Sequence, residues 1–236
     1  MWYSIVLIIG SYFLGAIPIQ YYIGRLRGYD LRNEYDLHIS LWRKVGPRYG
    51  IFGIIGDILK GVIPVVVGNL LNFEPYIVGL AGLAAVVGQM WPVFFKFDGE
   101  KGNTTGIGMV LALTPKSFLL FVIPVGLGAL IRTLPRLLDK NKVQGNRLKF
   151  GGPPSNSLPI GVAISFAFYP LTTTALFGKW FEYSMGVAII GIALFMLIEI
   201  RRMTAGLKAD LKIAEEKKQS KNSIVVNRLI LDRGFR

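Results

Sequence analysis

The 236-residue chain contains no cysteine, a single histidine and few charged residues. Without cysteine it forms no disulfide, performs no thiolate catalysis and binds no metal through sulfur. The single histidine, His38, excludes a site built from several histidines, and we expect neither a metal nor a cofactor. Charged residues make up 17% of the sequence, against roughly 25% in soluble domains. The composition therefore argues against an ordinary soluble protein.

Several functional signatures are also missing. The sequence shows no internal repeat, no nucleotide-binding motif and no Ser-His-Asp pattern. The net charge is +13, but no interleaving of basic and aromatic residues accompanies it, so we expect no nucleic-acid partner. The first apolar segment has no basic leader and no small-residue cleavage site. We therefore expect it to remain as a membrane helix and not to be removed as a signal peptide.

Long uncharged runs dominate the chain. They cover residues 1–24, 62–72, 81–95, 151–178 and 183–198. A helix needs about 20 apolar residues to cross a bilayer. The pattern predicts an all-α polytopic membrane protein.

Basic residues gather in four regions, residues 25–48, 96–101, 132–149 and the tail from Arg201. Because loops rich in Lys and Arg stay in the cytoplasm, we expect all four on that side of the membrane. Such regions also attract anionic headgroups, so membrane lipids are expected partners. The distribution of basic residues therefore predicts which connections between helices face the cytoplasm.

Seven transmembrane helices with an external N-terminus satisfy every basic region. We expect them near residues 2–23, 49–71, 76–95, 104–113, 117–134, 158–177 and 183–198. The fourth is too short for about 30 Å of hydrocarbon, so it crosses only where the bilayer thins or its polar turn sinks into protein. We expect a membrane domain at residues 1–203 and a polar, basic cytoplasmic tail at 204–236, helical near residues 208–221.

The most informative stretch is the glycine loop, residues 97–106, which lies between two apolar segments. Glycines let backbone N–H groups approach a ligand, and the helix that follows favours negative charge at its N-terminus. Lys101 adds a mobile positive charge. The pattern predicts a site for a phosphorylated or acidic substrate, with Gly99, Gly102, Thr104 and Thr105 as binding residues. The alternative is a polar turn between two helices.

Two further groups are candidates for this site. Asp57 and Lys60 lie three residues apart on one helical face within a span. Charges there are costly and indicate function, although the two can instead neutralise each other. In the first basic region, Arg43 can bind a phosphate in bidentate fashion or serve topology alone. Ser40 offers a hydroxyl, and we interpret His38 as a loop histidine and not as a base.

Together these motifs resemble those of the PlsY family. The matching segments are DLRN at residues 30–33, GDILKG at 56–61, GQMWPVFF at 88–95 and GEKGNTT at 99–105. PlsY proteins are bacterial membrane glycerol-3-phosphate acyltransferases that take the acyl chain from acyl phosphate. The resemblance implies seven spans, a cytoplasmic-side active site and a multi-pass protein of the bacterial inner membrane.

The resemblance also implies roles for particular residues. Lys101 and Arg43 would be the catalytic residues that bind phosphate, while Thr105 and the loop amides orient it. Acyl phosphate and glycerol 3-phosphate would be the substrates, and the reaction would serve phospholipid synthesis. Such a site needs no protein nucleophile, because positioning and charge neutralisation carry the chemistry.

The chain departs from the family pattern at several positions. Of the family's first motif only Arg43 remains, with Ser40 in place of a threonine. Other family positions are occupied by Gln89 for a histidine, Glu100 for a glycine, and Ile200 and Met203 for a histidine and an asparagine. A second hypothesis follows: a relative without catalysis that binds a lipid or phospho-compound, or supports a partner. A third is a transporter of phosphorylated solutes, against which the missing inverted repeat counts.

Overall fold

The computed structural model describes residues 2–32, 34, 37–138, 157–177, 181–204 and 207–216, which contain helices and no strand. The elements are α1 (Trp2–Ala16), α2 (Ile19–Leu26), α3 (Leu37–Lys44), α4 (Pro47–Leu70), α5 (Pro75–Met90), a 3₁₀ turn η1 (Val93–Phe95), α6 (Asn103–Leu113), α7 (Pro115–Leu138), α9 (Ser157–Phe177), α10 (Phe181–Thr204) and α11 (Leu207–Glu216). The predicted all-α class is confirmed.

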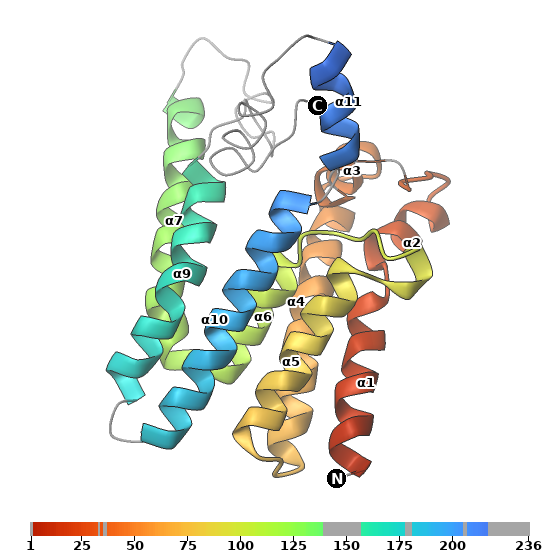
Figure 1. The fold of residues 1–236 in the computed structure, drawn as a ribbon. Coiled ribbons are helices and arrows are strands. Elements are labelled where there is room, and N and C mark those ends of the chain that lie inside the picture. The colour runs from red at the N-terminus through yellow and green to blue at the C-terminus, as the bar shows by residue number, and fades with distance from the viewer. Residues whose placement is uncertain are drawn as a thin grey trace.

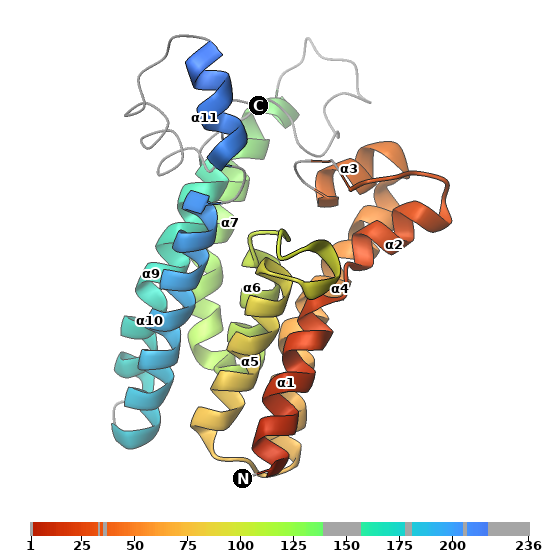
Figure 2. The same ribbon diagram turned by 45° about the vertical axis from the view of Figure 1, so that its right-hand side comes forward.

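The long helices lie side by side in a bundle (Figure 1). Helix α1 packs against α5, α4 against α6, α7 against α9, and α10 against both α9 and α5. Helices α2 and α3, the glycine loop and the C-terminal end of α10 lie together at one end of the bundle, and the N-terminus lies at the other (Figure 2). The glycine loop and the described part of the first basic region therefore lie at the same end of the bundle.

Helix α4 shows how the bundle meets its surroundings. Its apolar side chains Ile55, Leu59 and Val66 are exposed, while Asp57 and Lys60 are buried. Spacings of four and seven residues place the exposed side chains on one helical face. A helix that turns apolar groups outward and charges inward is suited to hydrocarbon and not to water. The helix therefore has the polarity of a membrane span.

Three described helices are long and apolar enough to cross a membrane: Pro47–Leu70, Pro75–Phe95 and Leu158–Leu176. The pair Trp2–Ala16 and Ile19–Leu26, bent by 40°, makes a fourth if it counts as one span, and Asn103–Leu113 and Pro115–Ile131 are shorter apolar helices. The membrane character is supported by these helices. The number of spans and the orientation stay predictions.

The first predicted helix, residues 2–23, is broken in two. Helix α1 ends at Ala16, and α2 begins at Ile19 after Pro18. Proline has no backbone N–H and restricts the residue before it, so the helix stops and restarts there. The break bends α2 by 40° from α1, and Gln20 and Gly24 of α2 are buried.

The first basic region also differs from the expectation, because it contains the short helix α3. The predicted tail helix begins at Leu207 and is described as far as Glu216. Most of the third basic region, residues 139–149, and the chain beyond residue 216 lie outside the described residues.

Helices α4 and α6 cross with their backbones in close contact. A Cβ atom at Gly61 would collide with the backbone of Thr105, and one at Gly108 would collide with the backbone of Ile58. Only glycine permits backbones to approach this closely. The crossing brings the charged face of α4 against the first turn of α6.

Candidate functional site

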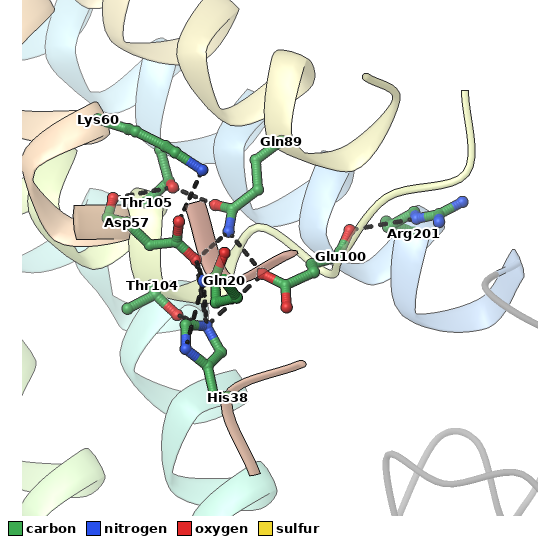
Figure 3. A network of polar contacts seen from close by, with 9 residues as sticks. All are labelled: Gln20, His38, Asp57, Lys60, Gln89, Glu100, Thr104, Thr105 and Arg201. Carbon is green, nitrogen blue, oxygen red and sulfur yellow. Dashed lines mark hydrogen bonds and ion pairs between the residues drawn. The ribbon is translucent and has the colours of Figure 1, made fainter. Parts of the chain in front are cut away.

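A network of polar side chains lies where the glycine loop meets the bundle (Figure 3). Its members come from five helices and the loop. We define the polar cluster as Gln20, His38, Asp57, Lys60, Gln89, Glu100, Thr104 and Thr105. None of these residues is adjacent to another in sequence except the two threonines, so the fold alone assembles the cluster.

Asp57 lies at the centre of the polar cluster and is completely buried. Its Oδ1 is 2.7 Å from Nζ of Lys60. Its Oδ2 accepts hydrogen bonds from Gln20 and from Nε2 of Gln89 at 2.5 Å, and lies 3.1 Å from Nε2 of His38. A buried carboxylate is tolerated only when it is paired and hydrogen-bonded in this way.

Gln89 joins the two carboxylates of the polar cluster. Its Nε2 donates to Asp57 and also to Oε2 of Glu100, at 2.9 Å. Its Oε1 accepts from the hydroxyl of Thr105, which also lies 3.0 Å from the carbonyl oxygen of Asp57. Gln89 occupies the position where the family resemblance places a histidine, and it keeps a polar donor there.

His38 points into the polar cluster from α3, although the sequence indicated an ordinary loop histidine. Its side chain is 18% exposed, and Nε2 lies 3.1 Å from Oδ2 of Asp57 and 3.6 Å from Oε2 of Glu100. Oγ1 of Thr104 is 3.5 Å away. The available signal was its spacing of three residues from Leu41, which is buried on the same face of α3.

The glycine loop folds back on the end of α5. The backbone amides of Gly99 and Glu100 donate to the carbonyl oxygens of Met90 and Gln89, each at 3.1 Å. Gly102 precedes α6 with φ of 77°, a left-handed conformation that favours glycine. This path turns the carboxylate of Glu100 toward the polar cluster and not away from it (Figure 3).

Arg201, near the C-terminal end of α10, binds the glycine loop through hydrogen bonds. Its guanidinium donates to Oδ1 of Asp98 at 2.7 Å, to the carbonyl oxygen of Gly99 at 2.5 Å and to that of Glu100 at 3.3 Å. The residue is 5% exposed, and its guanidinium lies 5.9 Å from the ring centre of Trp91. The sequence missed this role, because a basic residue after an apolar run looks like a topology signal.

The structure assembles some of the predicted site residues. Asp57, Lys60, Thr104 and Thr105 meet in the polar cluster, with Gly99 and Gly102 beside them in the glycine loop. Ser40 instead donates to Oε2 of Glu34, at 2.8 Å. Arg43 and Lys101 are not members of the polar cluster. Arg43 is exposed on α3, and Lys101 is half-buried in the glycine loop.

Two carboxylates that precede α3, Asp30 and Glu34, form ion pairs. A hydrogen bond from the side chain of Arg32 lowers the pKa of Asp30 to about 2. Hydrogen bonds from Lys44 and then Ser40 lower the pKa of Glu34 below its usual range. Both carboxylates therefore stay ionised near neutral pH, and Glu34 contacts both Ser40 and Lys44 of α3.

His38, Asp57 and Glu100 offer three potential metal-ligating atoms that lie within 4.8 Å of one another. The polar cluster contains two carboxylates, Asp57 and Glu100, and one ammonium, Lys60, beside the imidazole of His38. The cluster can therefore accept hydrogen-bond donors or a cation more readily than an unaccompanied anion.

The family model for glycerol-3-phosphate acyltransferase matches residues 5–138. Curated proteins named glycerol-3-phosphate acyltransferase are similar over about half of the chain. The protein from Geotalea daltonii is 40% identical over 119 residues, which cover 49% of this chain and 61% of the relative. That from Rubrobacter xylanophilus is 38% identical over 128 residues, which cover 53% and 60%. The chain thus spans about 60% of the length of these relatives.

Solved structures share the fold. A crystal structure of PlsY, described as an integral membrane glycerol 3-phosphate acyltransferase in its glycerol 3-phosphate form, matches with a TM-score of 0.66. The alignment is 24% identical and covers 92% of this chain and 94% of that one. The lysophosphatidic acid form matches with a TM-score of 0.65, covering 85% and 88%. The likeness establishes an all-helical fold shared with an integral membrane protein.

Proposed function

We propose, because the chain belongs to the glycerol-3-phosphate acyltransferase family, that it transfers an acyl group from acyl phosphate to glycerol 3-phosphate in phospholipid synthesis. The observation that carries this proposal is the junction of two family motifs. The buried Asp57–Lys60 pair of one motif contacts Thr105 of the other, directly beside the glycine loop. Polar groups buried at such a junction are costly unless they serve a purpose.

The proposed arrangement has seven spans: the bent pair α1–α2, then α4, α5, α6, α7, α9 and α10. The N-terminus lies outside, and the polar cluster faces the cytoplasm of a bacterial inner membrane. Residues 1–203 form the membrane domain, and residues 204–236 form a cytoplasmic tail. The gathering of α2, α3, the glycine loop and the C-terminal end of α10 at one end of the bundle supports this orientation, because basic residues belong on the cytoplasmic side.

The proposed chemistry needs no nucleophile from the protein. The hydroxyl oxygen of glycerol 3-phosphate attacks the acyl carbon, and the bond from that carbon to the phosphate oxygen breaks. The hydroxyl proton passes to the departing phosphate, which leaves as inorganic phosphate. Lys101 and Arg43 neutralise phosphate charge, which develops on the leaving group.

Positioning comes from the rest of the site. Thr104 and Thr105 and the amides near Gly99 and Gly102 orient the phosphates at the start of α6. Asp57, Lys60 and Ser40 complete the predicted binding residues. The apolar walls of α4 and α5 take the acyl chain, close to the lipid that surrounds the bundle.

The test is an assay of the purified full chain with acyl phosphate and glycerol 3-phosphate, which measures lysophosphatidic acid and inorganic phosphate. We expect turnover that falls about 100-fold or more in Lys101→Ala, as when one charge-stabilising donor is removed. Lys116→Ala is the matched control, because Lys116 is exposed at the start of α7, away from the glycine loop. Equal turnover in the two variants would contradict the role of Lys101.

A second function is favoured by one observation. The carboxylate of Glu100 points into the polar cluster and places negative charge beside the proposed phosphate site. A relative that binds a lipid or phospho-compound without catalysis is consistent with that charge. Binding of glycerol 3-phosphate by the wild-type chain without any product would favour this function over acyl transfer. Uptake of the compound into liposomes that contain the protein would instead indicate transport.

A further inference from the structure

We propose that His38, Asp57 and Glu100 form a binding site for one divalent first-row metal ion, of the Mn²⁺ or Zn²⁺ type, which carries the substrate phosphate. The existence of the metal site is argued from the polar cluster itself. The role of the ion in holding the substrate phosphate rests on the proposed function. The sequence predicted no metal because it contains a single histidine, and the three ligands lie in three segments that only the fold brings together.

The separations of the ligand atoms suit one ion. Two ligand atoms about 2.1 Å from a metal and about 90–109° apart lie about 3.0–3.4 Å from each other. Nε2 of His38 lies 3.1 Å from Oδ2 of Asp57 and 3.6 Å from Oε2 of Glu100. All three ligand atoms lie within 4.8 Å of one another. Small side-chain adjustments therefore bring the three onto a common ion.

The neighbours of these ligands hold Oδ2 of Asp57 and Oε2 of Glu100 close together through hydrogen bonds, among them those of Gln89. Lys60 pairs with Oδ1 of Asp57, on the opposite side of the carboxylate from the Oδ2 that faces His38. Gln89 donates to both carboxylates through one amide nitrogen and so holds them side by side. Carboxylates and amides in this supporting role orient the ligands of known metal sites.

Gln20 offers a fourth ligand. Its amide nitrogen lies 3.3 Å from Nε2 of His38 and donates to Asp57. The two ends of a carboxamide have nearly the same shape, so a half-turn presents the oxygen to a cation in place of the nitrogen. Three or four protein ligands leave open positions for water or a phosphate oxygen, as in catalytic metal sites.

The charge of the polar cluster supplies an independent argument. When its Nε2 ligates a metal ion, His38 is neutral, and Asp57 and Glu100 then outweigh Lys60 by one negative charge. A phosphate dianion beside that cluster is repelled, whereas a divalent cation converts the cluster to one net positive charge. The ion thus accounts for a phosphate site that contains Glu100 where the family resemblance expects glycine.

The decisive experiment titrates Mn²⁺ into the chelator-stripped full chain in detergent and follows free Mn²⁺ by electron paramagnetic resonance. We expect one Mn²⁺ per chain, displaced by Zn²⁺, and binding at least about tenfold weaker in Glu100→Gln and His38→Asn. Glu74→Gln is the matched control. It removes an exposed carboxylate just before α5, whereas the polar cluster lies at the C-terminal end of that helix. Circular dichroism and gel filtration confirm that each variant is folded.

Absence of stoichiometric binding of Mn²⁺ or Zn²⁺ at submillimolar concentration by the folded wild-type chain would overturn the site. So would equal affinity in Glu100→Gln and Glu74→Gln. Binding of glycerol 3-phosphate is then measured with and without Mn²⁺. An increase with the ion supports the bridging role, whereas equal affinity in both overturns that role. Metal binding without any glycerol 3-phosphate binding leaves the metal site intact and contradicts the proposed function.

Discussion

Replacing Arg201 with alanine should release the glycine loop from the end of the bundle. The buried guanidinium donates to the carbonyl oxygens of Gly99 and Glu100, and hydrogen bonds from charged groups contribute roughly 1.5–3 kcal/mol each. The carboxylate of Asp98 is 79% exposed, so its ion pair adds at most about 1 kcal/mol. We therefore expect loop docking to weaken by roughly 3 kcal/mol or more.

Hydrogen exchange of two amides reports this change directly. The amides of Gly99 and Glu100 donate to carbonyl oxygens at the end of α5 and are protected only while the loop is docked. A loss of roughly 3 kcal/mol corresponds to exchange about 100-fold faster in Arg201→Ala. Arg201→Lys keeps the charge but not the planar fork, and should fall between the wild type and the alanine variant.

Asp98→Asn is the matched control, because it removes the exposed ion pair and leaves both carbonyl contacts of Arg201. Its exchange should rise by no more than about fivefold. The reasoning is refuted if Asp98→Asn matches Arg201→Ala, which would assign docking to the surface ion pair. It is also refuted if neither amide responds to Arg201→Ala.

Three further predictions concern the polar cluster, the helix crossing and the loop before α3. Lys60→Met leaves the carboxylate of Asp57 buried without its ammonium and should destabilise the protein by about 3–5 kcal/mol in SDS-induced unfolding. The double variant with Asp57→Asn should recover part of that loss, and no recovery would contradict the pairing. Gly61→Ala should lower the unfolding midpoint because its methyl group collides with the backbone of α6, whereas Gly10→Ala, with no atom nearby, should not; equal effects would contradict the close crossing. The pKa of Asp30 is lowered to about 2, so its ion pairs persist above about pH 4 and are lost as pH falls through 2; a titration by NMR that finds an ordinary midpoint would contradict this.

The sequence could predict the helices of the bundle because their signal is local. An apolar run bounded by polar residues indicates a span wherever it occurs, and α4, α5 and α9 begin and end within a few residues of the predicted positions. The pairing of Asp57 with Lys60 was open to the same reasoning, since a spacing of three residues places both side chains on one face.

The rest of the candidate site depends on contacts between distant segments. Helix α3 has eight residues, and a helix of that length has little stability of its own. Its formation, and with it the direction of His38, follows from packing against α2 and α4. The reach of Arg201 to a loop about 100 residues earlier in the chain has no local pattern at all.

Burial separates Asp57 and Lys60, which match the motif of the family resemblance, from Glu100, which departs from it. Asp57 and Lys60 are almost completely buried and compensate each other, so a change to either one alone leaves an unpaired charge and costs about 3–5 kcal/mol. Glu100 lies at the edge of the polar cluster with its side chain 20% exposed, where water reduces the cost of a new charge. Its backbone stays fixed by Arg201 and by its own amide hydrogen bond, which any residue other than proline can make. The loop therefore accepts a carboxylate without losing its path, and the substitution changes the charge of the site while the scaffold around it stays the same.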